Sequence, residues 1–434
     1  MLAPEVESLP WAEQLATDDA SYRAQLAYLF DRSAFYREKL AGAGVDSADA
    51  AGGLAAIAEL PLTEKREIKA TCTPGDPIGT HLCVGQSEIV RIYSTSGTTG
   101  SPSYIPLTAE DLDNWVTGSA RSYAASGITA GERIVSTYNA GPFVAGAALA
   151  SFERIGLTHV PLGTGNTERL MLAVELLEPD AVVLTPSYAA YLVEWAAERD
   201  VDLRASSVAR VLVAGEPGGG EPAFRAKLEE GWGAQVTEAM GIGDIGVSLW
   251  GECEEQDGMH LGARGFLHAE LIDPQTGAVI EVADGATGEL VLTHLKQRAA
   301  PLLRFRTRDH VEVRLSTCGC GRTGPRVRCI GRTDDMLIVR GVNVFPSAIR
   351  EVVSAFAPDV SGHIVVRPQT HGVKQEPPLP VSVELGDGAA GGDELAAAIR
   401  DRLREALVVQ TRVELVPWGT LQRSEYKSKL VEHS

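Results

Sequence analysis

The pattern of apolar and polar positions changes twice along the chain, near Gly258 and near Gly331. Residues 22–40 carry apolar side chains at helical spacing, which predicts that the opening segment consists of helices. From Arg91 onward, short apolar runs alternate with amphipathic stretches, as in a parallel sheet with crossover helices. The expected strands are residues 133–137, 159–162, 181–185 and 209–214, and the expected helices are residues 143–154, 167–177, 188–199 and 222–231.

After Gly258 the pattern becomes one of β-hairpins, with a turn at residues 273–277. Its expected strands are residues 269–272, 288–293 and 311–315. A strand-rich hairpin at residues 331–344 opens a last region, with helices expected at 346–356 and 394–407 and strands at 363–367, 380–385 and 413–416. We therefore expect an α/β protein. Residues 1–331 would form a large N-terminal domain with mostly parallel sheets plus a β-rich subdomain, and residues 332–434 a small, mobile α+β C-terminal domain.

The composition is that of a folded, acidic protein. The 434 residues include 58 acidic and 39 basic ones, which gives a net charge of −19. Such an excess disfavours binding to nucleic acid or to an anionic membrane, although a local basic pocket for a small anion remains compatible with it. The N-terminal residues lack the apolar run of a secretory signal, and the apolar stretch at 140–152 is too short to span a bilayer. We therefore expect a cytoplasmic protein whose six cysteines are reduced or bind metal.

The sharpest motif is the run Tyr-Ser-Thr-Ser-Gly-Thr-Thr-Gly-Ser-Pro at residues 93–102. Small residues let the backbone approach a polyanion, while successive N–H groups and hydroxyls donate hydrogen bonds to phosphate oxygens. The alternative is an ordinary Ser/Gly linker. The loop lacks the Gly-Lys-Ser/Thr ending of a Walker motif. The candidate phosphate-binding residues are Ser96, Gly97, Thr98, Thr99 and Gly100.

Residues 96–102 resemble the nucleotide loop of the acyl-adenylate-forming enzymes, and more closely that of the phenylacetate–CoA ligase group. Five further segments resemble motifs of this family in the same order: residues 214–217, 240–244, 304–309, 331–346 and 420–427. The resemblance covers nearly the whole chain. It implies that ATP and Mg²⁺ activate a carboxylate as an acyl-adenylate, which coenzyme A then converts to a thioester.

The resemblance assigns roles to residues around the nucleotide. Glu216 and Pro217 match the adenine-side turn, and Asp309 the ribose-binding strand end. A carboxylate suits the ribose because it can accept hydrogen bonds from both hydroxyls. Arg332 would contact phosphate or ribose, and Asp244 would take the magnesium role of the family's longer Glu.

Each assignment has a structural alternative. Asp309 could instead form a surface ion pair with Arg306 or Arg308, Glu216 could cap a helix, and Arg332 could be a solvated charge on a hairpin.

The C-terminal loop 420–427 resembles the family's catalytic-lysine loop, and its register selects Lys427. This lysine would offset charge that develops at the α-phosphate during adenylation. The loop departs from the family pattern at Gln422 and Tyr426, so Lys429 is the alternative within the loop. Two solvated tail lysines are the structural alternative. By the same resemblance, Asp334 is the interdomain hinge.

The resemblance also locates two substrate channels. Gly341 would let the pantetheine arm of CoA pass close to the backbone. The acyl pocket would lie between residues 138–143 and 240–243, lined by Tyr138, Phe143, Met240 and Gly241. Two aromatic side chains and a small residue favour an aryl or arylacetic acid, while the alternative is that the aromatic pair belongs to the core.

A second candidate site consists of Cys253, His260, Cys318 and Cys320. Three thiolates and one imidazole are ligands that structural Zn²⁺ prefers. Cys329 is the nearest alternative ligand, whereas each cysteine alone is more often a small buried apolar residue. A partial cluster of Cys72, His81 and Cys83 has no evident fourth ligand, and we expect no metal there.

The leading functional hypothesis is an ATP-dependent ligase that joins a small-molecule carboxylate to CoA. One rival is an adenylating enzyme that passes the acyl group to a carrier protein or an amine. Another is a nucleotide-binding regulator without catalysis, which a mobile lysine loop disfavours. The sequence leaves open whether the chain forms a homodimer.

Overall fold

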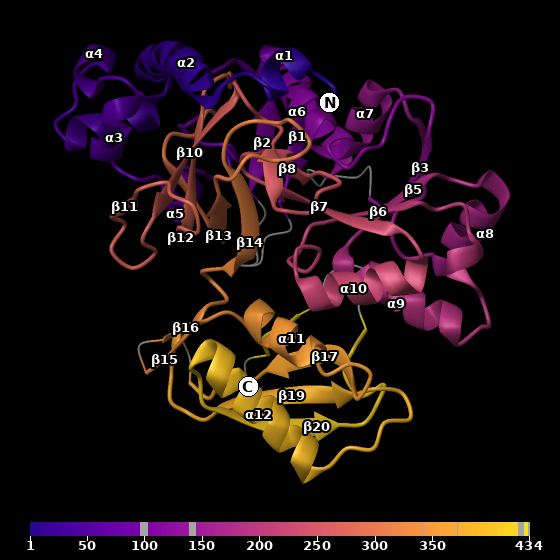
Figure 1. Cartoon of the computed structure of the whole chain (residues 1–434). Helices are drawn as coiled ribbons and strands as arrows, with labels where there is room; N and C mark the ends of the chain where they lie inside the picture. The colour runs from indigo at the N-terminus through magenta and orange to yellow at the C-terminus, as the bar shows by residue number, and fades with distance from the viewer. Residues whose placement is uncertain (96–102, 139–144, 341, 371, 424–428, 433–434) are drawn as a thin grey trace.

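The computed structural model describes the chain except residues 96–102, 139–144, 341, 371, 424–428 and 433–434 (Figure 1). The N-terminal region is helical, with short 3₁₀ turns at Leu54–Glu59 and Gln86–Glu88. Its helices are α1 (Pro4–Glu7), α2 (Trp11–Arg32), α3 (Ala34–Gly42), α4 (Ala48–Ala51) and α5 (Lys65–Ala70). The prediction that residues 22–40 are helical is confirmed, and they are divided between α2 and α3. The helix breaks at Ser33, whose hydroxyl accepts a hydrogen bond from the Tyr36 N–H and caps α3.

A twelve-stranded sheet forms the centre of the molecule, and one half of it is parallel, as predicted. The parallel half consists of β3 (Arg133–Ser136), β4 (Thr158–Pro161), β5 (Ala181–Leu184), β6 (Arg210–Ala214) and β7 (Gln235–Ile242). Helices α6 (Ala109–Ala124) and α7 (Gly146–Ile155) cover one face, and α8 (Thr167–Leu177), α9 (Pro186–Ala197) and α10 (Pro222–Trp232) cover the other. Alternate strand residues face opposite helix layers: Ile134 packs with α6 and α7, and Val135 with α8–α10.

The predicted hairpins continue this same sheet as its antiparallel half. They comprise β8 (Gly246–Glu252), β9 (Met259–Leu261), β10 (Leu267–Ile272), β11 (Val279–Ile280), β12 (Thr287–His294), β13 (Phe305–Arg314) and β14 (Arg326–Arg332). The short strand β9 joins the two halves, because it pairs with β8 on one side and with β14 on the other. Strands β1 (Arg91–Ser94) and β2 (Tyr104–Leu107) form a separate hairpin that flanks the glycine-rich loop.

The C-terminal elements form two small sheets and two helices below the large sheet in the view of Figure 1. The strands are β15 (Leu337–Val339), β16 (Val342–Val344), β17 (Val360–Val366), β18 (Lys374–Gln375), β19 (Leu379–Leu385) and β20 (Thr411–Val416), and the helices are α11 (Pro346–Ser354) and α12 (Asp393–Leu407). Ile349, Val383 and Ile399 belong to a hydrophobic core made entirely of side chains from this region. The mixed α/β class with a small C-terminal unit is confirmed.

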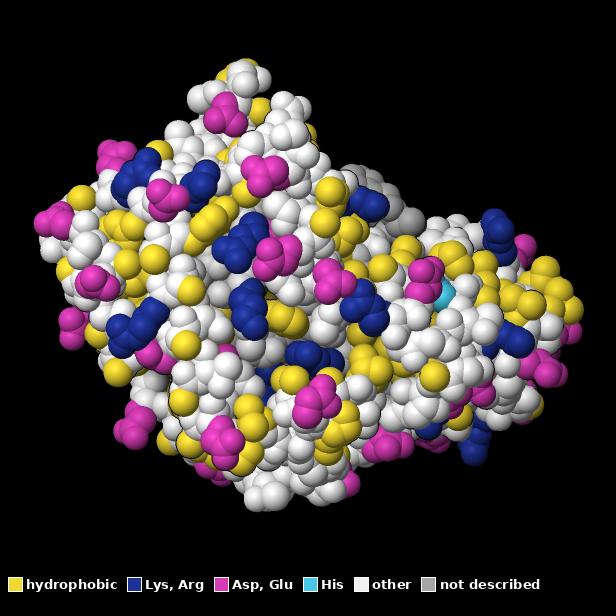
Figure 2. All heavy atoms as spheres, turned by 90° about the horizontal axis from the view of Figure 1, so that it is seen from above, with side chains coloured by type: hydrophobic (Ala, Val, Ile, Leu, Met, Phe, Trp, Pro, Cys, Tyr) yellow, Lys and Arg dark blue, Asp and Glu magenta, His cyan; other side chains and the backbone are white. Residues whose placement is uncertain are grey.

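Charged side chains of both signs are spread over the surface. On the face in Figure 2, acidic and basic side chains are interspersed with apolar ones, so this face presents no continuous positive surface for nucleic acid. Within the described ranges, no helix combines the length and apolar character needed to cross a membrane.

Candidate active site

Several candidate site residues follow the carboxyl ends of the parallel strands. Strands β3, β5, β6 and β7 run in one direction, so their carboxyl ends meet at a single edge. Tyr138 follows β3, Ser187 follows β5, Glu216 follows β6 and Asp244 follows β7. Ligands of open α/β sheets bind outside this edge, so the topology alone brings residues from four segments to one candidate site.

Glu216 contacts the first turn of α9. Its Oε1 accepts hydrogen bonds from the Ser187 N–H, at 2.8 Å, and from the Ser187 hydroxyl. Glu216 therefore does contact the start of a helix, as the capping alternative proposed. The helix is α9, however, and not the one that follows Pro217. Sequence reasoning missed Ser187, although Thr185 is a recognisable N-cap two residues earlier: its hydroxyl accepts from the Tyr188 N–H.

Asp244 forms an ion pair that the sequence did not suggest. The Lys65 Nζ in α5 lies 2.6 Å from the Asp244 Oδ2, although 179 residues separate the two. The Asp244 side chain is 17% exposed, so the pair is partly shielded from water. Lys65 therefore places a positive charge beside the carboxylate predicted to bind magnesium, in a protein that is acidic as a whole.

Asp309 and Arg332 face each other across β13 and β14. The Arg332 Nη1 lies 3.3 Å from the Asp309 Oδ1, and the Arg332 Nη2 lies 2.7 Å from the Asp334 Oδ2. Burial raises the pKa of Asp309 to about 6, although the charge of Arg332 acts in the opposite direction. The predicted ribose residue, phosphate contact and hinge residue therefore form one connected polar group.

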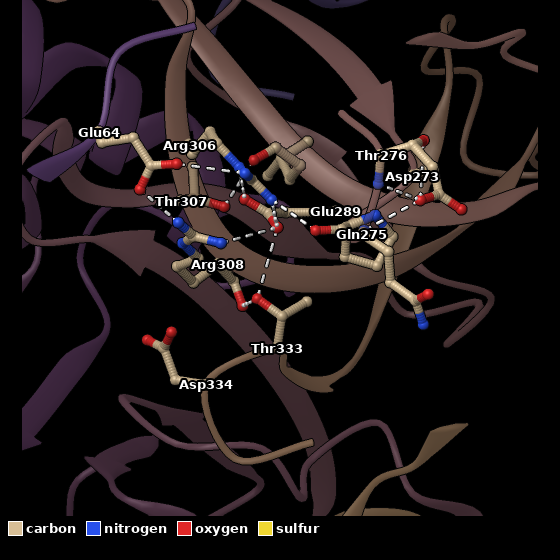
Figure 3. Close-up of polar contacts among 12 residues, drawn as sticks. Glu64, Asp273, Gln275, Thr276, Glu289, Arg306, Thr307, Arg308, Thr333 and Asp334 are labelled. Carbon is tan, nitrogen blue, oxygen red and sulfur yellow. Dashed lines mark hydrogen bonds and ion pairs between the residues drawn. The ribbon is translucent and has the colours of Figure 1, made fainter. Parts of the chain in front are cut away.

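The two arginines that were the alternative partners of Asp309 bind other carboxylates (Figure 3). Arg306 and Arg308 both pair with Glu64 and with Glu289, whose carboxylate is fully buried. Arg308 has a φ of 66°, in the left-handed region that non-glycine residues rarely adopt. The network thus holds the backbone immediately before Asp309 in an unusual conformation, and the proposed surface pairing of Asp309 with these arginines is wrong.

The described acyl-pocket candidates lie at least partly in the core. Tyr138 and Met240 are buried, and the Tyr138 hydroxyl accepts a hydrogen bond from the Tyr123 hydroxyl at 3.3 Å. A Cβ on Gly241 would lie 2.5 Å from the backbone nitrogen of Ser248 in β8. The close approach of β7 and β8 therefore requires glycine at this position, independently of any ligand.

Several candidates lie outside the described residues: Ser96, Gly97, Thr98, Thr99, Gly100, Phe143, Gly341 and Lys427.

The cysteine and histidine side chains come together as predicted. Cys253 follows β8, His260 lies in β9, and Cys318 and Cys320 lie in the loop between β13 and β14. Their ligand atoms all lie within 4.8 Å of one another. The Sγ atoms of Cys253 and Cys318 are 3.6 Å apart, and the Cys320 Sγ is 3.4 Å from the His260 Nε2. Ligands at Zn–S distances of ~2.3 Å in a tetrahedron lie about 3.8 Å apart, so the donor set and its spacing fit zinc.

The other cysteines do not join this group, which is the one set of side chains in the described part of the chain that could hold a metal ion. Cys329 lies in β14 outside the cluster. The His81 Nδ1 contacts the Thr71 hydroxyl at 3.3 Å, and the Cys72 and Cys83 thiols donate to backbone carbonyls.

The chain is similar to known proteins in both sequence and structure. Residues 341–434 match the family model of the AMP-binding enzyme C-terminal domain. The chain is 34% identical to a phenylacetate–coenzyme A ligase of Thermus thermophilus, over 98% of this chain and 97% of the relative. It is 33% identical to the phenylacetate–coenzyme A ligase of Escherichia coli, over 93% of this chain and 91% of the relative.

The structure resembles 2-hydroxyisobutyryl-CoA ligase, at 26% identity, in a complex with 2-HIB-AMP in the postadenylation state. The TM-score is 0.90, over 99% of this chain and 92% of the other. Against the same ligase in the thioesterification state with 2-HIB-AMP and CoA, the TM-score is 0.72 at 27% identity, over 99% and 91% of the two chains. Identity above 30% along almost the entire chain establishes the family: the chain belongs to the phenylacetate–CoA ligases and is an AMP-forming acid–CoA ligase.

Proposed function

We propose that the protein activates an aromatic acid, either an aryl or an arylacetic acid. ATP and the acid give an acyl-adenylate and pyrophosphate, and the CoA thiol then displaces AMP to form the thioester. The observation that carries the choice of acid is the 34% identity over 98% of the chain to a phenylacetate–coenzyme A ligase. The family membership and the edge of the parallel sheet support the reaction type.

Adenylation would take place at this edge. The Asp309 carboxylate would accept hydrogen bonds from the ribose hydroxyls, while the turn at Glu216 and Pro217 would contact adenine. Lys427 would approach the α-phosphate and offset the charge that develops there. The loop that contains Ser96, Gly97, Thr98, Thr99 and Gly100 would bind the phosphates, Arg332 would add a phosphate or ribose contact, and Tyr138, Phe143, Met240 and Gly241 would surround the acid.

Two metal ions fit the residues present. Asp244 would supply a carboxylate oxygen to Mg²⁺, which takes one or two carboxylates together with substrate phosphates. Bound there, Mg²⁺ neutralises triphosphate charge. Zn²⁺ would be held by Cys253, His260, Cys318 and Cys320 and would be structural, because four protein ligands leave no open position.

The thioester step would need a different arrangement of the chain. We propose that residues 1–331 and 332–434 are the two moving domains, that Asp334 is the hinge and that Gly341 lies beside the pantetheine arm. The closer resemblance to the postadenylation state of 2-hydroxyisobutyryl-CoA ligase than to its thioesterification state supports assigning the present orientation to adenylation.

A panel of acids tests the proposal. Purified protein with ATP, Mg²⁺ and CoA is given phenylacetate, benzoate, 2-hydroxyisobutyrate or a medium-chain fatty acid. Pyrophosphate release and thioester formation are measured for each. We expect an aromatic acid to give the highest kcat/KM. A preference for 2-hydroxyisobutyrate would contradict the substrate class, and AMP formation without thioester would contradict CoA as the acceptor.

A further inference from the structure

Two arginines of the C-terminal region reach carboxylates of the N-terminal region. Arg350 lies in α11 and Arg423 follows β20, whereas their partners Glu221 and Glu194 lie beside α10 and in α9. In Figure 1, α11 and β17 lie against α9 and α10. These contacts therefore cross the boundary between the two proposed domains.

Arg350 makes the more buried of the two contacts. Its Nε lies 3.0 Å from the Glu221 Oε2 and its Nη2 lies 2.7 Å from the Glu221 Oε1, a bidentate pair. The same Nη2 donates to the Pro217 carbonyl at 2.8 Å, and the guanidinium lies 5.0 Å from the centre of the Phe224 ring. Arg350 is only 5% exposed. It therefore connects α11 both to the start of α10 and to the proposed adenine turn.

Arg423 lies between two carboxylates, one from each region. Its Nε is 2.8 Å from the Glu194 Oε2 in α9, and its Nη2 is 2.7 Å from the Glu384 Oε1 in β19. Glu194 also pairs with His363 of β17 at 3.2 Å and with Lys227 of α10 at 3.4 Å. Arg423 lies four positions before Lys427, so this contact fixes one end of the proposed catalytic loop.

The carboxylates that bind these arginines lie either in the C-terminal or in the N-terminal region, and a domain rotation would affect the two groups differently. Ile349 and Val353 of α11 are buried in the C-terminal core, so Arg350 moves with that domain. Glu384 also belongs to it and would stay with Arg423, whereas Glu221 and Glu194 would be left behind. Rotation would break these charge-assisted hydrogen bonds, and a carboxylate that stays buried without its partner is costly, so the contacts favour the present orientation.

We propose that Arg350 and Arg423 are positioning residues that hold the C-terminal domain in the adenylation orientation through Glu221 and Glu194. Arg350 also fixes the adenine turn through the Pro217 carbonyl. The inference rests on the proposed function and adds to it the residues that select between the two half-reactions.

The test separates the two half-reactions in the full-length protein. Arg350→Gln and Glu194→Gln are compared with Glu270→Gln. Glu270 forms a similarly buried ion pair with Arg304 but entirely within the N-terminal region; Glu270 is 6% exposed and Glu221 is 9% exposed. Adenylation is followed by ATP–pyrophosphate exchange, and thioester formation is followed from supplied acyl-adenylate.

We expect Arg350→Gln and Glu194→Gln to slow adenylation about 10- to 100-fold. Losing a hydrogen bond between charged groups lowers the population of the adenylation orientation by about this factor. Thioester formation should be unchanged or faster. Glu270→Gln should leave the ratio of the two rates unaltered. Equal slowing of both half-reactions by Arg350→Gln would overturn the proposal.

A second readout does not depend on activity. Hydrogen–deuterium exchange of residues 217–221 and 346–354 should rise in Arg350→Gln and in Glu221→Gln, and not in Glu270→Gln. Unchanged exchange in folded variants overturns the proposal. If Arg350→Gln does not fold, Glu221→Gln decides both readouts. If the wild-type protein activates no acid, the proposed function fails, and exchange still decides the role of the interdomain contacts.

Discussion

Asp309 is a candidate site residue whose charge changes with pH just below neutrality. Burial raises its pKa from the ordinary 3.8 to about 6, so it is ionised above pH 6 and protonated below. Only the ionised form has both oxygens available to two ribose hydroxyls. We therefore predict that adenosine binds more tightly as pH rises through about 6. Calorimetry between pH 5 and 8 measures this affinity. Adenosine is used because it has no phosphate group that would itself titrate in this pH range.

The matched variant is Asp309→Asn, which keeps the shape and removes the titration. It should bind adenosine about tenfold more weakly at pH 8, as expected for a lost charged hydrogen bond, with little dependence on pH. An affinity of the wild-type protein that stays constant across pH 6 would show that Asp309 does not contact the ribose.

The role predicted for Lys427 depends on how the loop 420–427 is aligned with the family's catalytic-lysine loop. Lys427→Ala should slow adenylation by ~10²–10³, the usual cost of removing an electrostatic contact made in the transition state. Thioester formation from supplied acyl-adenylate should remain close to the wild-type rate. Lys429→Ala is the control. If it abolishes adenylation while Lys427→Ala does not, the register of the loop is displaced by two residues.

At the scale of elements, the cysteine–histidine cluster ties together the region where the two halves of the sheet meet. Its ligands come from the end of β8, from β9 and from the β13–β14 loop. Strand β9 pairs with β14 through only two residue pairs, Arg326 with His260 and Val327 with Met259. A metal ion bound there would therefore reinforce a narrow connection.

We predict about one zinc per chain in protein purified without added metal. Cys318→Ser with Cys320→Ser should reduce the zinc content to near zero and lower the melting temperature, because ligand loss removes binding energy from the folded state. Cys329→Ser should retain the metal. Mass spectrometry of the metal content and thermal unfolding check both. Equal, negligible zinc in wild-type and variant protein would exclude the site.

Elements with local signals were predictable from sequence. The helix expected at 167–177 is observed as α8 with the same bounds, and the side chain of Asn166 caps it. The break between α2 and α3 also has a local signal, since Ser33 is a preferred N-cap residue. Pairings between distant segments carry no such signal. Neither the Lys65–Asp244 ion pair nor the joining of β9 to β14 could be inferred from neighbouring residues.

At the scale of the whole molecule, the reaction would depend on two orientations of one small domain. Proline fixes φ near −65°, so Asp334→Pro should restrict the hinge. We predict normal adenylation and at least tenfold slower thioester formation, the reverse of the Lys427→Ala result. Rapid-quench measurement of each half-reaction tests this. Equal rates in both steps would show that rotation does not occur at Asp334.

The contact between Arg350 and the Pro217 carbonyl has a consequence for product release. Coupling between two equilibria is reciprocal: if nucleotide at the turn favours the present orientation, this orientation favours nucleotide by the same factor. After the proposed rotation the turn would lose this hydrogen bond, and AMP would then be bound by a turn with one constraint fewer. The same domain rotation would thus promote both thioester synthesis and the release of AMP. The enzyme could then release both products before ATP binds and favours the adenylation orientation again.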